Sequence, residues 1–102
     1  MYCIYMLRCR GGSLYTGIAA DIEKRLQTHF TRGAACAKYT RSHPAESLAA
    51  LWQTDGHAAA ARLEVFLKQL PRAKKLALIA GETDIRTLFG ERLGEFSYER
   101  VK

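Results

Sequence analysis

The stretch from residue 2 to residue 17 decides the fold, and it reads YCIYMLRCRGGSLYTG. Its first eight residues are rich in Tyr, Ile, Met and Leu and lead toward Gly11-Gly12, a pattern typical of a β-strand entering a turn. Residues 14–17 can form a short return strand. The stretch therefore predicts an N-terminal antiparallel hairpin.

The length of the hairpin turn decides whether Tyr5 and Tyr15 lie on the same face of the sheet. Side chains alternate between the two faces along a strand. A plain two-residue turn at Gly11-Gly12 would place Tyr15 opposite Arg8, and so on the other face from Tyr5. An odd-length loop or a bulge returns both tyrosines to one face, and consecutive glycines suit it because one can take a positive φ. We predict such a loop.

The next segment has the pattern of an amphipathic helix. Asp21 is a suitable N-cap for a helix of about three turns, in which Ile22, Leu26 and Phe30 form an apolar stripe. Residues 33–46 lack a helix or strand period and contain a proline, so we expect a loop there.

One more strand and further helices follow. Residues 47–54 favour a third strand, and residues 57–70 favour a long helix with one apolar face. Pro71 ends this helix or opens the next, over residues 72–80. Thr83-Asp84 can cap a short helix. The order predicts an α/β fold with a small three-stranded antiparallel sheet flanked by helices.

Composition indicates one folded domain with a polyanionic partner. The chain has 102 residues and a net charge of +6, with a pI near 9.5. We assign residues 1–82 to the domain and residues 83–102 to an extension packed on it or trailing from it. No membrane span or secretory signal is indicated, so we expect a cytoplasmic protein. The three cysteines lack the spacing of a disulfide framework or zinc site. Clustered Lys and Arg suit phosphates.

Two helical segments carry polar side chains beside their apolar stripes. Arg25 and His29 are four residues apart and share one helix face. Glu64 borders the stripe of the long helix. Two helices covering one sheet could aim these three groups at the same spot. Each also has an ordinary interpretation, because strand tyrosines commonly pack in a core and Arg25 or Glu64 can form an i,i+4 pair with Asp21 or Lys68.

Taken in order, these residues resemble the GIY-YIG endonuclease superfamily. The match consists of Cys3-Ile4-Tyr5, Tyr15-Thr16-Gly17, Arg25 with His29, and a lone Glu64 in the second long helix. It covers roughly residues 2–80 and is nearest to the small single-domain bacterial branch. It is also similar to the incision domain of excision-repair nucleases, which implies DNA repair, and to certain homing endonucleases. Cys3 and Thr16 depart from the usual motif residues, and Ile18 follows where the family often has lysine.

The resemblance implies a role for each residue. Glu64 would hold a magnesium or manganese ion, and Tyr5 would be the general base or position the attacking water. Tyr15 would hydrogen-bond the water or the phosphate, and Arg25 would neutralise phosphate charge. His29 would assist proton transfer or orient Tyr5. A tyrosine has a free pKa near 10, so we expect positive charge from Arg25 and the metal ion to lower the pKa of Tyr5.

The resemblance and the charge pattern together predict a metal-dependent endonuclease acting on DNA. We expect single-stranded, branched or damaged DNA as substrate, although RNA stays open, and expect neither a membrane nor an obligate protein partner. The alternatives are a nucleic-acid-binding module without catalysis, and an interaction protein whose basic surface only keeps it soluble. Candidate nucleic-acid contacts are Lys24, Arg32, Lys38, Tyr39, Arg41 and Lys68.

Overall fold

The N-terminal hairpin has a turn of odd length. In the computed structural model, β1 (Tyr2–Cys9) and β2 (Leu14–Ala19) are antiparallel, and Leu7 lies opposite Tyr15. The short helix η1 (Arg10–Gly12) forms the turn, and its two glycines have φ of 86° and 87°. Tyr5 and Tyr15 therefore lie on the same face of the sheet, as the pleat argument predicted.

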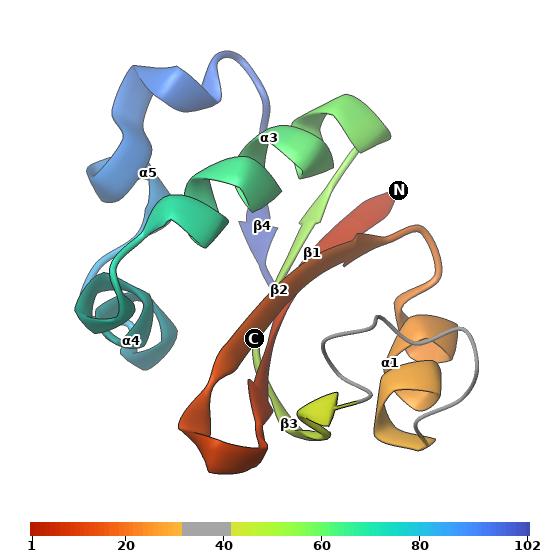
Figure 1. Cartoon of the computed structure of the whole chain (residues 1–102). Coiled ribbons are helices and arrows are strands. Elements are labelled where there is room, and N and C mark those ends of the chain that lie inside the picture. The colour runs from red at the N-terminus through yellow and green to blue at the C-terminus, as the bar shows by residue number, and fades with distance from the viewer. Residues whose placement is uncertain (32–41) are drawn as a thin grey trace.

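The structure describes residues 1–31 and 42–102 (Figure 1). Within them, the sheet has the strand order β2-β1-β3-β4. Strand β3 (Ala45–Thr54) pairs with the free side of β1, and β4 (Glu99–Arg100) pairs with β3. The α/β class and the three expected strands are confirmed. The fourth strand, which comes from the C-terminus, was not expected.

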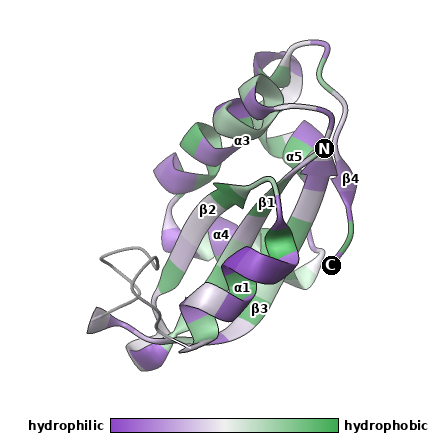
Figure 2. Cartoon of the chain, turned by 90° about the vertical axis from the view of Figure 1, so that its right-hand side faces the viewer, coloured by the Kyte–Doolittle hydropathy of each residue, from purple (hydrophilic) through white to green (hydrophobic). Residues whose placement is uncertain are grey.

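Helices cover both faces of the sheet. Helices α3 (His57–Gln69), α4 (Arg72–Ala80) and α5 (Ile85–Phe89) lie on one side, and α1 (Ile22–Thr31) lies on the other. Figure 2 shows α1 in front of the sheet and α4 behind it. Neighbouring residues of β1 consequently point into two separate cores.

The larger core lies under α3 and contains Ile4 and Met6 of β1 together with Trp52 of β3. The smaller core lies under α1 and contains Tyr5 and Leu7. Side chains of β1 alternate between the two faces of the sheet, and both faces are covered. Nearly every residue of β1 is therefore apolar.

Helix α1 corrects one sequence-based prediction. Ile22 and Leu26 pack on the smaller core as expected, but Phe30 is 42% exposed. The fully buried residue of this helix is His29. The expected end of the helix and most of the loop at 33–46 lie outside the described residues.

The segment after residue 82 packs on the same core. The Asp84 side chain caps α5 by accepting a hydrogen bond of 2.8 Å from the Thr87 amide, and Ile85 and Phe89 are buried. The short helix η2 (Gly90–Leu93) follows, and the Tyr98 hydroxyl donates to the Ala59 carbonyl at 2.6 Å. The expected boundary at residue 82 stays a prediction. No helix in the described part of the chain combines the length and apolar character that a bilayer span requires.

Candidate active site

The side chain of Tyr5 extends toward the edge of the sheet over a glycine of the neighbouring strand. Tyr5 lies opposite Gly17, which belongs to the edge strand β2. A Cβ atom added to Gly17 would lie 2.5 Å from the Tyr5 hydroxyl oxygen and 3.1 Å from a ring carbon of Tyr15. No other residue fits this position without moving the phenol. The sequence analysis assigned no role to Gly17. An odd-length turn places Gly17 opposite Tyr5, and this pairing could have indicated that the position needs a glycine.

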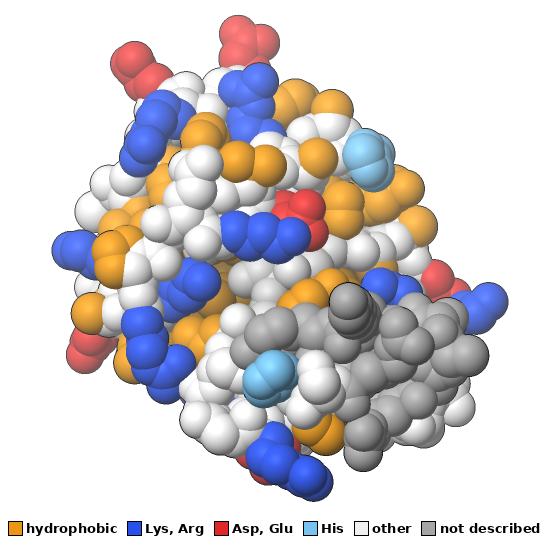
Figure 3. Space-filling model, viewed as in Figure 1, with side chains coloured by type: hydrophobic (Ala, Val, Ile, Leu, Met, Phe, Trp, Pro, Cys, Tyr) orange, Lys and Arg blue, Asp and Glu red, His pale blue; other side chains and the backbone are white. Residues whose placement is uncertain are grey.

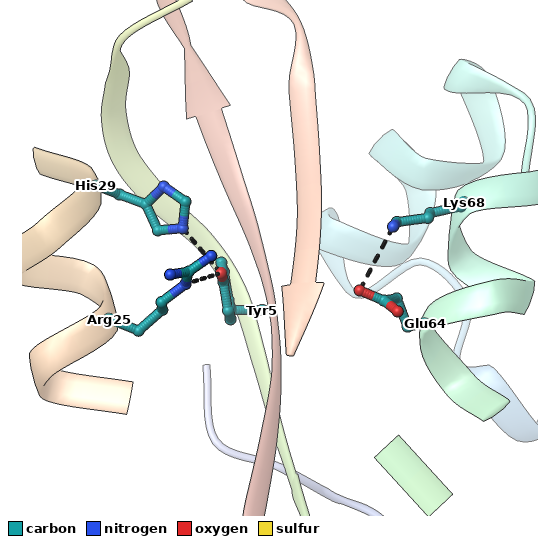
Figure 4. A network of polar contacts seen from close by, with 5 residues as sticks. All are labelled: Tyr5, Arg25, His29, Glu64 and Lys68. Carbon is teal, nitrogen blue, oxygen red and sulfur yellow. Dashed lines mark hydrogen bonds and ion pairs between the residues drawn. The ribbon is translucent and has the colours of Figure 1, made fainter. Parts of the chain in front are cut away.

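Two side chains of α1 meet the Tyr5 hydroxyl (Figure 4). The Tyr5 oxygen lies 2.9 Å from Nε2 of His29, and Nε of Arg25 donates to the same oxygen over 3.4 Å. Both Tyr5 and His29 are fully buried. The four-residue spacing of Arg25 and His29 places both on the sheet-facing side of the helix, where they converge on one oxygen atom.

Tyr15 completes the cluster. Its ring centroid lies 5.3 Å from that of His29 and 6.3 Å from that of Tyr5. The structure therefore brings together four of the five residues singled out from the sequence: Tyr5, Tyr15, Arg25 and His29.

Burial controls the proton affinities in this cluster. It raises the pKa of Tyr5 to about 12, even though the hydrogen bond from Arg25 acts in the opposite direction. Arg25 lowers this pKa, as expected, but desolvation of the phenolate outweighs it, so that the pKa of Tyr5 lies above its usual value of 10 in the protein without a metal ion. Burial, followed by the charge of Arg25, lowers the pKa of His29 below its usual 6.5. At neutral pH the phenol is protonated and the imidazole is neutral.

Glu64 lies across the sheet from this cluster. Figure 4 shows the hairpin strands between Glu64 on α3 and the three side chains Tyr5, Arg25 and His29. The Glu64 carboxylate forms an ion pair of 3.5 Å with Lys68, and its side chain is 21% exposed. Its negative charge is among the causes that raise the pKa of Tyr5. Glu64 is therefore coupled to the cluster through its charge.

The surroundings of Glu64 suit one kind of metal ion. Within residues 1–31 and 42–102, no group of three or more His, Cys, Asp or Glu side chains is placed to hold a metal. A single accessible carboxylate leaves the remaining positions to water and substrate oxygens. Magnesium and manganese accept such sites, whereas zinc sites require more protein ligands. The donor set therefore fits the ion that the resemblance implies.

Of the six candidate nucleic-acid contacts, the structure describes Lys24 and Lys68. Lys24 is exposed on α1 and lines a hollow of about 320 Å³ together with Arg25 and Thr28. The other candidate nucleic-acid contacts lie outside the described residues: Arg32, Lys38, Tyr39 and Arg41.

Comparison with known families agrees with this arrangement. Residues 1–77 match the sequence model described as the GIY-YIG catalytic domain. The chain belongs to the GIY-YIG family. All five residues discussed above fall inside the matched range, and the extension from residue 83 onward falls outside it.

Relatives of this GIY-YIG chain occur in several bacteria. It is 41% identical over 98 residues to a UPF0213 protein of Xanthomonas axonopodis, covering 96% of this chain and 92% of the relative. A UPF0213 protein of Fusobacterium nucleatum is 39% identical over 79 residues, with 78% and 77% covered. The solution NMR structure of the UPF0213 protein from Bacillus halodurans is 36% identical, has a TM-score of 0.51, and covers 80% of this chain and 86% of that chain. These names state neither a reaction nor a substrate.

Proposed function

We propose that this chain is a metal-dependent endonuclease that hydrolyses DNA phosphodiester bonds, preferring single-stranded, branched or damaged DNA. The observation that carries the proposal is the contact of 2.9 Å between the Tyr5 hydroxyl and Nε2 of His29. It gives a buried tyrosine an adjacent proton acceptor, and phosphodiester hydrolysis needs an activated water.

The high pKa of Tyr5 is compatible with a relay. When neutral His29 carries its proton on Nδ1, Nε2 accepts the proton of the phenol while the phenol accepts a proton from the attacking water, so no free phenolate forms. The imidazolium that results lies near Arg25, whose charge lowers the pKa of His29. A bound phosphate would offset that charge and favour protonation of His29.

The other residues of the site stabilise charge. Arg25 would neutralise the negative charge that builds on the phosphate, and Tyr15 would hydrogen-bond the phosphate or the water. Glu64 would hold the magnesium or manganese ion, which supplies Lewis-acid stabilisation of a phosphate oxygen when bound.

Two observations favour the alternative of a nucleic-acid-binding module without catalysis. Burial raises the pKa of Tyr5 to about 12, and the Glu64 carboxylate already has a cationic partner in Lys68. If Lys68 excludes a metal ion and His29 takes no proton, the same surface would bind nucleic acid without cutting it.

Cleavage assays on matched substrates separate these functions. Single-stranded, branched and duplex DNA, and RNA of the same sequence, are incubated with magnesium or manganese. We expect metal-dependent cleavage of single-stranded or branched DNA that falls by at least about 100-fold in Tyr5→Phe and in Glu64→Gln. Lys102→Gln, an exposed substitution in the C-terminal segment, is the control and should cleave normally. Salt-sensitive binding without cleavage would support the binding module, and the absence of both would leave an interaction protein.

A further inference from the structure

A basic surface starts beside Glu64 and ends at the hairpin tip. Lys68 at the end of α3 is 54% exposed and contacts Glu64 at 3.5 Å. Arg72 is the first residue of α4 and is exposed. Its Nη2 lies 3.7 Å from the position that a Gly12 Cβ would occupy, so its guanidinium rests against the hairpin tip. Arg10 is exposed in the same turn.

Two of these three cations, Arg10 and Arg72, form no ion pair in the described part of the chain. The third cation, Lys68, is paired with Glu64. Figure 3 shows Lys and Arg side chains on the left side of this face, from the middle of the molecule toward the hairpin, while acidic side chains other than one near the middle lie toward the outline. The surface therefore keeps its positive potential.

Stability of the fold does not account for this charge. The first turn of α4 contains no acidic residue, although it carries Arg72, Lys74 and Lys75. Cations at the start of a helix oppose the helix dipole and so lower the stability of the helix. A surface that costs stability while remaining solvent-accessible is suited to an anionic partner.

We propose that Lys68, Arg72 and Arg10 form a track that binds the sugar-phosphate backbone of the substrate on one side of the bond to be cut. This inference rests on the proposed function, because that function places the cleaved bond at Glu64 and Tyr5. The tip suits the approach of a backbone, because Gly11 has no side chain and no atom of residues 1–31 or 42–102 lies within 4 Å of its Cβ position. The track reads no bases, so it gives affinity and direction without sequence preference.

The first test is the salt dependence of binding. Affinity of Arg72→Gln, Arg10→Gln and the double variant for a labelled oligonucleotide is measured from low to moderate salt, with a chelator present to prevent cleavage. We expect each single variant to bind several-fold more weakly, and the slope of log affinity against log salt to fall by about 0.7 on single strands or 0.9 on duplex. In the double variant the slope should fall by about twice that amount. Lys102→Gln, which removes one exposed charge from the segment beyond β4, should keep the wild-type slope.

The second test locates the track relative to the cut. Single phosphates on either side of the cleaved bond are replaced by neutral methylphosphonates. We expect wild-type binding to weaken for replacements on one side, and Arg72→Gln to be insensitive at one of those positions because its contact is already missing.

The outcomes distinguish this inference from the endonuclease proposal. Wild-type slopes in both arginine variants, together with normal cleavage, overturn the track and leave the endonuclease standing. The expected slopes without any metal-dependent cleavage support the track and overturn the endonuclease. Equal melting temperatures of all variants establish that the differences do not come from unfolding.

Discussion

At the scale of single residues, the absent side chain of Gly17 positions Tyr5. Gly17→Ala puts a methyl carbon at 2.5 Å from the Tyr5 oxygen, a separation that forces the phenol away from His29 and Arg25. We expect cleavage to fall by about 100-fold or more, since displacing a reacting group by about 1 Å has effects of this size. Steady-state cleavage rates of the variant and the wild type check this.

Gly56→Ala is the matched control for this substitution. Among the residues that the structure describes, none has an atom within 4 Å of the Cβ position of Gly56, and its φ of −150° suits any residue. Normal cleavage by Gly17→Ala would show that Tyr5 has no part in catalysis or that it acts from another position.

His29 makes the stability of the protein depend on pH. Its pKa in the folded protein is below the 6.5 of the exposed side chain, so the unfolded chain takes up this proton first as the pH falls. Its contribution is complete above pH 6.5 and is lost progressively as the pH falls through the folded pKa. We expect the free energy of unfolding to decline below pH 6.5.

Urea unfolding of the wild type and of His29→Gln, at several pH values, measures this contribution. The variant should be less stable at neutral pH but should show a flatter dependence on pH below 6.5. Identical slopes in the two proteins would show that His29 keeps an ordinary pKa in the folded state.

At the scale of secondary-structure elements, strand β2 contains a polar group that the fold does not use. Thr16 is 4% exposed, and its hydroxyl has no hydrogen-bond partner in the described part of the chain. A buried hydroxyl without a partner costs about 1–3 kcal/mol. We expect Thr16→Val, which keeps the shape of the side chain, to raise the free energy of unfolding by about 1 kcal/mol in denaturant titrations.

Thr54→Val is the matched control in strand β3. Thr54 is equally buried at 5%, but its hydroxyl donates to the Ser97 carbonyl at 2.8 Å. This substitution should therefore destabilise the protein. A loss of stability in Thr16→Val as well would mean that the hydroxyl of Thr16 has a partner.

At the scale of the whole molecule, the C-terminus closes the second edge of the sheet. The Val101 amide donates to the Leu51 carbonyl at 2.8 Å. The Arg100 guanidinium donates to the carbonyls of Leu78 and Ile79 at the end of α4, at 2.8 and 3.0 Å, and lies over the ring of Trp52. The last residues thus tie β3 to α4.

Deleting residues 99–102 tests this closure. The truncated protein would expose the backbone groups of β3, and unpaired strand edges promote association between chains. We expect a lower melting temperature and aggregation that increases with protein concentration, measured by light scattering. A monodisperse truncated protein of unchanged melting temperature would show that the edge needs no cover.

The sequence alone predicted the parts of the fold that depend on local periodicity. Side-chain alternation along residues 2–17 showed that Tyr5 and Tyr15 share a face only if the turn has odd length, and the consecutive glycines favoured such a turn. The spacing of Arg25 and His29 placed both on one helix face. The boundaries of α3 and α4 followed from apolar stripes and Pro71.

Only the tertiary structure decided which groups are buried and what that does to their chemistry. The burial of His29 in place of Phe30, the addition of β4 and the separation of Glu64 from the cluster by the hairpin depend on contacts between distant segments, which no local pattern encodes. The same holds for the pKa of Tyr5. Its residue type and its partner Arg25 were evident in the sequence, but the desolvation that outweighs this partner arises only when α1 closes over the sheet.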